Sequence, residues 1–391
     1  MSICPRFEHT PDSQPEGTVV VAMSGGVDSS VAALLVKRAG RPAIGVSMQV
    51  WDYRNHGGSA TRATCCAPDD FTDARKVADL IGIPYYVFDF EATFRREVID
   101  KFVAAYERGE TPNPCVDCNN KVKFRELRER AATFGGAFVA TGHYARVEHG
   151  PLGSRLLRGV DTQKDQSYFL YGIRPAELAQ TLFPVGGYTK SEVRDIAREA
   201  GLVTAEKAES QDICFVSGSA ADFVARIGRG GRSGAIVTPS GEKIGEHAGV
   251  HRFTVGQRRG LGVGGTSEPL YVLRIDAETD TVVAGPRAEL EESGFRLTMP
   301  NWIAPGVRAR LADTSRVHTF AALAQLRHRH PGVPVEVTVD TNGGVSARFT
   351  GTWTPVTPGQ AGVLYDLDNI EVLGGGTIAR CADSGGSVGE G

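Results

Sequence analysis

The chain has 391 residues, with 43 Lys and Arg against 46 Asp and Glu, which gives a formal net charge of −3. This length allows two or three domains, and the balanced charge excludes nucleic-acid binding through overall charge alone. The apolar runs are shorter than the roughly 18 residues of a transmembrane helix, so no membrane contact is expected. Residues 1–17 are polar and contain proline, unlike a signal peptide, which predicts a cytoplasmic protein.

The first predicted element is a strand at residues 19–23, which are all apolar and mostly β-branched, as in a buried parallel strand. A glycine turn follows, and then a helix whose apolar residues recur on one face until Gly40. A strand, a turn and a helix N-terminus bring together free backbone N–H groups, which can bind a phosphate. Residues 24–30 fit neither GxxxxGK[ST] nor GxGxxG, and an ordinary capped turn is the alternative.

Strands and helices alternate as far as residue 143. The predicted strands are residues 43–48, 85–88 and 137–140, and the predicted helices are residues 71–81, 94–106 and a segment around Leu127. This alternation predicts an α/β fold with a doubly wound parallel sheet. Because ligands of such sheets bind at the carboxyl ends of the strands, we expect Ser24, Met48 and Gly142 to share one crevice.

The pattern changes after about residue 215, where helical periodicity fades and short β runs begin. These runs are residues 270–275, 281–284, 335–339 and 345–349, and Asn342-Gly343 between the last two is typical of a hairpin. We expect a small, mostly-β linking domain and then a C-terminal β-barrel. The predicted boundaries are a flexible tail at 1–17, the α/β domain at 18–214, the linking domain at 215–292, the barrel at 293–380 and a disordered tail at 381–391.

Seven cysteines stand at positions 4, 65, 66, 115, 118, 214 and 381. An odd number in a long chain argues against a secreted disulfide framework. Cys115 and Cys118 form a CxxC just before a predicted helix with two lysines in its first turn, an environment that favours thiolates. For this pair alone, zinc, redox chemistry and no chemistry all stay open, although a four-thiolate zinc site would need a second CxxC. Cys214 beside Phe215 has the pattern of a buried core thiol.

Six motifs make the chain resemble the tRNA 2-thiouridylases of the PP-loop ATP pyrophosphatase superfamily, over about residues 18–380. They are residues 24–30, 111–114 with Cys118-Asn119, 140–146, 164–170, 210–216 and 256–262. The resemblance implies an enzyme that uses ATP to adenylate the C2 oxygen of the wobble uridine in tRNA and then replaces this oxygen by sulfur. The products would be 2-thiouridine, AMP and pyrophosphate.

The resemblance also implies roles for single residues. Cys214 would carry a persulfide, Cys118 would be its partner in a disulfide, and Asp28 would assist Mg²⁺. ATP would contact Ala22, Met23, Ser24, Gly25, Gly26, Val27, Asp28, Ser29, Met48 and Gly142. The tRNA would contact Asn113, Pro114, Cys115, His143, Lys164, Asp165, Gln166, Arg327, His328 and Gln360. The implied partners are the tRNAs for lysine, glutamate and glutamine, and a persulfide donor protein that is a cysteine desulfurase or a sulfur relay.

Cys115 departs from the family pattern, in which an aspartate follows Asn-Pro as a candidate general base. Asp117 is close enough in sequence to replace that carboxylate. As an alternative, Cys115, Cys118 and Cys214 could converge as three thiolates and hold an iron–sulfur cluster with one open iron position.

Two other classes of function stay open. The chain could be another PP-loop enzyme that adenylates a different substrate, such as an amidotransferase-type ligase or a lysidine synthetase, but Cys118 and Cys214 would then have no purpose. It could also be a non-catalytic nucleotide- or RNA-binding module, which would need neither Asp28 nor the paired thiols.

Overall fold

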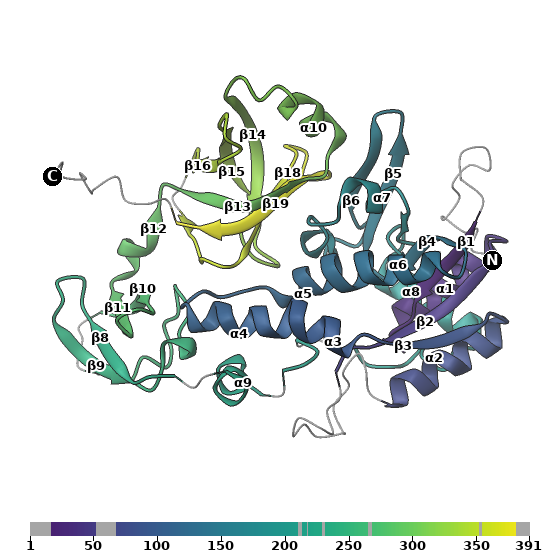
Figure 1. Cartoon of the computed structure of the whole chain (residues 1–391), viewed down its shortest axis with the longest axis horizontal. Coiled ribbons are helices and arrows are strands. Elements are labelled where there is room, and N and C mark those ends of the chain that lie inside the picture. Colours follow the sequence, from purple (N-terminus) through teal and green to yellow (C-terminus); the bar gives the residue numbers. More distant parts are fainter. Residues whose placement is uncertain are drawn as a thin grey trace.

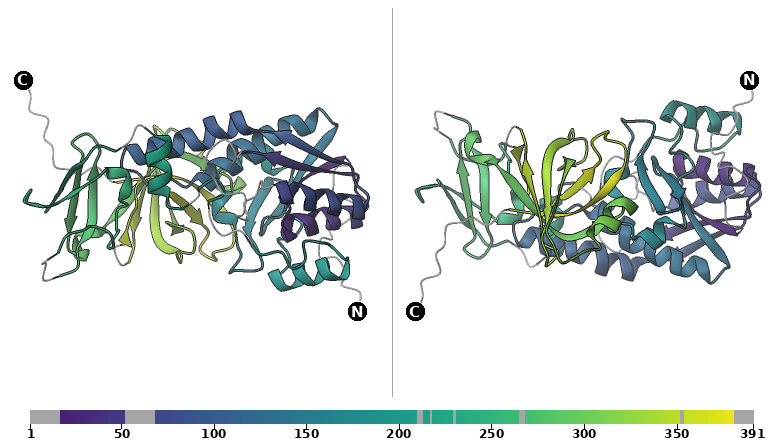
Figure 2. Two further views of the ribbon diagram at one scale, coloured as in Figure 1. Left: turned by 90° about the horizontal axis from the view of Figure 1, so that it is seen from below. Right: turned by 90° about the horizontal axis from the view of Figure 1, so that it is seen from above.

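The computed structural model describes residues 17–51, 68–209, 213–216, 218–228, 231–264, 268–351 and 354–380. The predicted tails, together with Cys4, Cys65, Cys66 and Cys381, lie outside these residues apart from Gly17. An α/β unit, a closed barrel and a small sheet succeed one another along the molecule, with the barrel between the other two (Figure 1, Figure 2). In the described part of the chain, every helix is too short or too polar to cross a bilayer.

The α/β unit is built on a five-stranded parallel sheet in the order β3-β2-β1-β4-β7. Its strands are β1 (Thr18–Ala22), β2 (Ala43–Gln49), β3 (Tyr85–Asp89), β4 (Gly136–Thr141) and β7 (Thr181–Leu182). Side chains alternate across a strand, and in β1 Val19 and Val21 join one apolar cluster while Val20 and Ala22 join another. Both faces are therefore buried, and the prediction of a doubly wound α/β fold is confirmed.

Helices cover both faces of the sheet. The first cluster contains side chains of α1 (Val27–Arg38), α2 (Pro68–Ile81) and α8 (Lys190–Glu199). The second contains side chains of two composite helices. These run as α3 (Glu91–Phe94), the π-helical η2 (Arg95–Ile99) and α4 (Asp100–Glu107), and as α5 (Pro114–Asp117), the π-helical η3 (Cys118–Glu126) and α6 (Leu127–Ala132). Inserted π-helical turns are frequent at functional sites.

A switch in strand order positions the site. The chain moves outward from β1 to β2 and β3 on one side, and to β4 and β7 on the other. The crevice at such a switch lies where the carboxyl ends of the two central strands diverge. This is the place of the turn after β1 and of Gly142 after β4.

Beyond β4 the chain forms a hairpin that the sequence patterns did not predict, β5 (Ala145–Gly150) and β6 (Gly153–Arg158). The end of β6 reaches the C-terminal barrel, where Leu157 bridges to Glu371 and the Arg158 N–H donates to the Ile370 carbonyl at 2.9 Å. The short helix α7 (Pro175–Leu178) precedes β7.

The linking sheet has the order β10-β11-β8-β9. Its strands are β8 (Gly234–Val237), β9 (Lys243–His247), β10 (Tyr271–Asp276) and β11 (Thr281–Gly285), and α9 (Ala220–Ile227) precedes them. The long helix ending in α4 runs beneath the barrel toward this sheet (Figure 1).

The C-terminal unit is a closed six-stranded barrel in the order β13-β16-β15-β14-β18-β19. The strands are β13 (Gly294–Trp302), β14 (His318–Gln325), β15 (Val333–Val339), β16 (Val345–Phe349), β18 (Ala361–Tyr365) and β19 (Val372–Ala379). The helix α10 (Pro305–Leu311) follows β13. The short strands β12 (Glu291–Glu292) and β17 (Thr354–Pro355) pair with each other outside the barrel. The predicted hairpin joins β15 to β16, and Gly343 has a φ of +81° there. The barrel prediction is confirmed.

Candidate active site

The turn between β1 and α1 is shaped by its own small side chains. The backbone N–H of Ser24 donates to Ser29 Oγ at 3.1 Å, and the Ser29 and Ser30 hydroxyls donate to the Gly26 carbonyl at 3.0 and 2.9 Å. Gly26 is the N-cap of α1 and has no side chain that could cover the first N–H groups of the helix. No side chain caps these N–H groups, and helix N-termini of this kind favour anions.

Two glycines allow the backbone to approach its neighbours closely at this turn. Gly25 has a φ of +72°, and a Cβ there would lie 2.4 Å from the Asp70 carbonyl oxygen. At Gly142, a Cβ would lie 2.6 Å from the Ser29 nitrogen. A larger residue at either position would therefore displace the start of α1 or its neighbour.

A cavity of about 330 Å³ opens above this turn. Of the residues predicted to hold ATP, nine line it: Ala22, Met23, Ser24, Gly26, Val27, Asp28, Ser29, Met48 and Gly142. Gly25 is outside this lining and acts through the shape of the turn. The ends of three strands thus contribute to one crevice, as the position of the strands in the sheet predicts.

Asp28 is held by an ion-pair chain across the cavity. Lys190 Nζ lies 2.7 and 2.8 Å from its two carboxylate oxygens and 2.9 Å from Glu209, and Lys164 Nζ lies 2.7 Å from Glu209. Burial alone would raise the pKa of Glu209, but hydrogen bonds from Lys164 and Lys190 outweigh it and lower this pKa to about 2. Glu209 is therefore an anion throughout the neutral range and fixes both lysines.

Tyr144 completes this arrangement. Its hydroxyl donates to Asp28 Oδ1 at 2.7 Å. Burial, followed by the Asp28 charge, raises the pKa of Tyr144, so the phenol keeps its proton. Tyr144 also contacts Gln166, because its backbone N–H donates to the side-chain Oε1 of Gln166 at 3.0 Å.

Cys118 and Cys214 line the same cavity as the turn between β1 and α1. Both are thiols, and both pack at the edge of the apolar cluster on one face of the sheet. Cys118 is the first residue of η3, and the buried Asn119 beside it donates to the Phe169 carbonyl at 3.1 Å. The core-thiol interpretation of Cys214 is thus only partly right, because its side chain also reaches the cavity.

Cys115 is exposed and is absent from the cavity lining. Within the described residues, no three His, Cys, Asp or Glu side chains are grouped so that they could hold a metal ion. The predicted convergence of Cys115, Cys118 and Cys214 is therefore wrong, and these residues do not fit an iron–sulfur cluster. Asp117, the predicted substitute base, also stays outside the lining, and burial raises its pKa.

The residues predicted to contact tRNA separate into groups. His143, Lys164 and Gln166 line the cavity. His143 is buried, its Nδ1 lies 2.7 Å from Thr141 Oγ1, and burial followed by the Lys123 charge lowers its pKa well below the usual value. It is therefore a neutral ring. Asp165 turns away from the cavity and pairs with Arg158 at 2.6 Å, so the expected contact of its side chain with tRNA is not supported.

The other predicted tRNA residues lie where the barrel meets the α/β unit. Gln360 Nε2 donates to the Thr111 carbonyl at 2.7 Å, which ties the barrel to the loop that leads to Asn113, Pro114 and Cys115. Arg327 is exposed after β14. The ring of His328 lies 4.6 Å from that of Phe169, and burial followed by the Arg329 charge lowers the pKa of His328.

The sequence patterns missed several polar residues of the cavity, including Tyr144, Lys190 and Glu209. One signal was available for Lys190. Thr189 and Glu192 form a capping box, which marks Lys190 as the first residue of a helix. Nothing local marks that this helix start faces Asp28.

Family models match most of the described chain. Family models match residues 17–218 as a tRNA methyl transferase HUP domain, residues 221–286 as a tRNA methyl transferase PRC-barrel domain and residues 292–378 as an aminomethyltransferase β-barrel domain. Among solved structures, a 4-thiouridine synthetase–RNA complex with bound ATP overlaps in part, with 16% identity, a TM-score of 0.33 and coverage of 54% of this chain and 46% of that one, too little to weigh.

Curated relatives match at much higher similarity. The tRNA-specific 2-thiouridylase MnmA of Geobacter metallireducens is 48% identical over 374 residues, which covers 94% of this chain and 98% of the relative. The protein of the same name from Rhodospirillum centenum is 45% identical over 384 residues, covering 95% of this chain and 94% of the relative. The chain therefore belongs to the MnmA family of tRNA-specific 2-thiouridylases.

Proposed function

We propose that this chain is an ATP-dependent tRNA 2-thiouridylase that replaces the C2 oxygen of the wobble uridine by sulfur. One observation carries the proposal: the anion-binding turn after β1 and the thiols of Cys118 and Cys214 line a single cavity. Activating an oxygen with ATP requires the donors of that turn, and supplying sulfur requires thiols. The family relationship supports the same function.

In the first step, the uridine C2 oxygen attacks the α-phosphate of ATP, and the bond from this phosphorus to the bridging oxygen of the β-phosphate breaks. Pyrophosphate leaves, and the oxygen becomes part of an adenylate. Backbone N–H groups at the start of α1 and the hydroxyl of Ser24 stabilise the phosphate charge in this step.

Asp28 fits a role in binding Mg²⁺. This ion is usually held by one or two carboxylates together with substrate phosphates. The Asp28 oxygens accept three hydrogen bonds from Lys190 and Tyr144, which leaves a lone pair on Oδ2 for a cation. When bound, Mg²⁺ neutralises phosphate charge, while Lys190 keeps the Asp28 carboxylate turned into the cavity.

Sulfur then enters from Cys214. The terminal sulfur of a Cys214 persulfide attacks C2, and AMP leaves with the former C2 oxygen. The Cys118 thiolate next attacks Cys214 Sγ. The bond between Cys214 Sγ and the sulfur now attached to C2 breaks, and its electrons stay on the sulfur at C2. The products are 2-thiouridine and a Cys118–Cys214 disulfide, which an external thiol reduces before the next turnover.

The tRNA reaches the cavity as an unstacked anticodon loop, since a uridine must leave its stack to be modified. We propose that Lys164, Gln166 and the neutral His143 contact the uridine or its neighbours. Arg327 and His328 on the barrel, and Asn113, Pro114, Cys115 and Gln360 below it, are proposed contacts for the rest of the stem and loop.

The finer assignments are proposals of the same kind. The tRNA substrates are those for lysine, glutamate and glutamine, and the sulfur donor is a cysteine desulfurase or a sulfur-relay protein. The protein works in the cytoplasm. Residues 18–214 act as the catalytic domain, residues 215–292 as a linker and residues 293–380 as the tRNA-binding barrel.

Nucleoside analysis of tRNA tests the function. Unmodified tRNA is incubated with the protein, ATP, Mg²⁺ and a persulfide donor, then digested and analysed by mass spectrometry. We expect 2-thiouridine that requires ATP, with one pyrophosphate released per sulfur inserted. Uridine that gains a methyl group from a methyl donor, as the family-model description would suggest, and gains no sulfur would contradict the proposal.

A further inference from the structure

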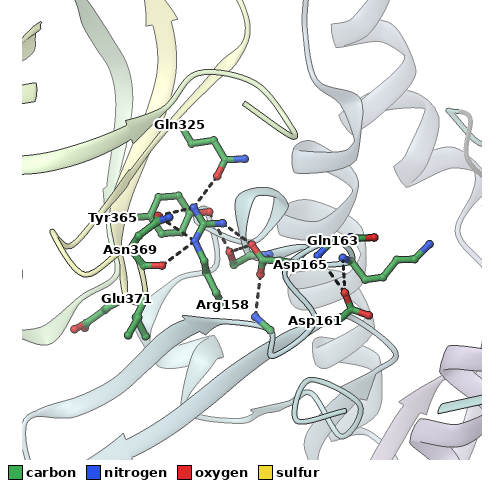
Figure 3. A network of polar contacts seen from close by, with 12 residues as sticks. Arg158, Asp161, Gln163, Asp165, Gln325, Tyr365, Asn369 and Glu371 are labelled. Carbon is green, nitrogen blue, oxygen red and sulfur yellow. Dashed lines mark hydrogen bonds and ion pairs between the residues drawn. The ribbon is translucent and has the colours of Figure 1, made fainter. Parts of the chain in front are cut away.

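Arg158, at the end of β6, joins the two units of the molecule. Its guanidinium donates to Asp165 at 2.6 Å within its own unit, and to Gln325 at 2.9 Å and Asn369 at 2.8 Å on the barrel. The guanidinium carbon also lies 3.7 Å from the centre of the Tyr365 ring. Only 17% of the Arg158 side chain is exposed, so water cannot readily replace these partners. Figure 3 shows Arg158 between Asp165 and the barrel residues.

Asp165 has its acceptor positions filled by the protein. Besides Arg158, its carboxylate accepts from the Gly159 N–H at 2.9 Å and from the Ser167 hydroxyl at 2.9 Å. Its side chain is 5% exposed. Asp165 therefore sets the path of its own backbone and does not present an acceptor to a ligand.

The two neighbours of Asp165 point the other way, into the cavity. Lys164 binds Glu209 there, and Gln166 accepts the backbone N–H of Tyr144. The Tyr144 hydroxyl in turn donates to Asp28. A continuous chain of direct contacts thus connects the barrel to the phosphate-binding turn through Arg158 and Asp165.

The barrel holds the same segment at a second point. The ring of His328 packs against that of Phe169 at 4.6 Å, and the Tyr365 hydroxyl lies 3.0 Å from Ser167 Oγ. Tyr168 Oη also donates to the Ala361 carbonyl at 2.9 Å. The barrel therefore contacts the segment from Ser167 to Phe169 along its length, on the side away from the cavity.

We propose that Arg158 is a positioning residue for the thiolation reaction: held by Gln325 and Asn369 of the barrel, it fixes Asp165 so that Lys164 and Gln166 face the tRNA uridine. The barrel is then part of the active-site scaffold as well as a surface for tRNA. This inference rests on the proposed function, because it concerns the residues proposed to contact tRNA.

The test compares three variants in tRNA-dependent pyrophosphate release. Arg158→Met removes the guanidinium that joins the α/β unit to the barrel. The double variant Gln325→Met with Asn369→Gly removes only the barrel side chains and leaves the Arg158–Asp165 pair, and glycine suits the φ of 58° at position 369. Arg155→Met is the matched control. Arg155 lies on the same strand and bridges to Glu371 of the barrel at 2.8 Å, but it is 44% exposed and no contact joins it to Asp165 among those described.

We expect Arg158→Met and the double variant each to raise KM for tRNA by at least about tenfold, while KM for ATP stays within about twofold. Arg155→Met should leave both within about twofold. A purely structural role would lower the folded fraction, and so kcat, without moving KM for tRNA. Wild-type KM for tRNA in the double variant, at a wild-type melting temperature, would overturn the proposal.

A second readout does not depend on the chemistry. Hydrogen exchange of the backbone amides of residues 164–167, measured without tRNA or ATP, should be at least about tenfold faster in the double variant than in wild type and unchanged in Arg155→Met. If wild-type protein releases no pyrophosphate with tRNA, the proposed function fails, and this exchange measurement still decides the positioning role. Unchanged exchange in the double variant would overturn it.

Discussion

The α/β unit and the barrel use their interiors differently. At the end of the parallel sheet, charged and polar side chains line a cavity of about 330 Å³ together with apolar ones, whereas the barrel is filled by apolar side chains such as Phe295, Leu297 and Val337. Open parallel sheets leave a crevice where the strand order switches, and a closed six-stranded barrel leaves no such gap. The chemistry therefore belongs to the sheet edge, and the barrel can act only through its loops and its outer surface.

The largest expected effect is a difference in 2-thiouridine yield between a variant of Cys214, which lines the cavity, and a variant of the exposed Cys115. Cys214→Ala should lower the yield of 2-thiouridine by at least about a thousandfold, because Cys214 is the proposed carrier of the transferred sulfur. Cys115→Ala should lower the yield by at most about tenfold, since Cys115 is exposed, lies outside the cavity lining and is proposed only as one of several tRNA contacts. Nucleoside analysis measures both variants. Equal losses in the two variants would contradict the division between the thiols.

The next effect compares carboxylates of the two regions. Asp28→Asn should slow tRNA-dependent pyrophosphate release by about a hundredfold, because it removes the charge that pairs with Lys190 beside the phosphate-binding turn. Asp340→Asn is the control, since Asp340 holds the barrel hairpin by accepting N–H groups that an amide oxygen also accepts. A normal rate in Asp28→Asn would remove Asp28 from the activation step.

Gly25 and Gly343, which both have a positive φ, extend the comparison between the α/β unit and the barrel. Gly25→Ala should weaken ATP binding by about tenfold and lower the free energy of unfolding by about 1–3 kcal/mol, because the new Cβ meets the Asp70 carbonyl at the anion site. Gly343→Ala in the barrel hairpin has open space around it and should cost stability only, with normal ATP affinity. Calorimetric titration with ATP measures the affinities. ATP affinity weakened equally in both would argue against the turn as the phosphate site.

The smallest effect is a pH dependence of stability. The pKa of Glu209 is lowered to about 2 in the folded protein, so its stabilising contribution is complete above the ordinary value of 4.5 and is lost as the pH falls toward 2. Glu209→Gln should lower the melting temperature by about 1–3 °C at pH 6, with a difference that shrinks between pH 5 and about 2. The control is Glu336→Gln in the barrel, an exposed partner of Arg348. A difference that grows toward low pH would contradict the assigned ion pairs.

Sequence patterns predicted the parts of the site that local rules determine. The apolar run before Ser24, the glycine turn and the order of strands and helices are sufficient to bring Met48 and Gly142 to the same edge of a parallel sheet. The thiol pair came from the family resemblance, and Cys118 and Cys214 do line the cavity together.

What the patterns could not predict depends on packing between distant segments. Lys190 reaches Asp28 across 162 positions of sequence, and Arg158 reaches Gln325 across 167. Asp165 was grouped with Lys164 and Gln166 as a tRNA contact because the three are adjacent, but the chain turns here, so that Lys164 and Gln166 line the cavity while Asp165 pairs with Arg158 beside the barrel. No local pattern shows which side chains of such a turn will line a binding site.

The most direct measurement of the central claim separates the two half-reactions in one cavity. Cys214→Ala protein is mixed with a limiting amount of tRNA, Mg²⁺, a persulfide donor and ATP labelled at the α-phosphate, and labelled tRNA, pyrophosphate and 2-thiouridine are quantified in a single turnover. We predict that label accumulates on tRNA in step with pyrophosphate release, with no 2-thiouridine, because the turn after β1 activates the oxygen and only the sulfur is missing. Formation of 2-thiouridine, or no label on tRNA from a variant that still binds ATP and tRNA, would contradict the claim.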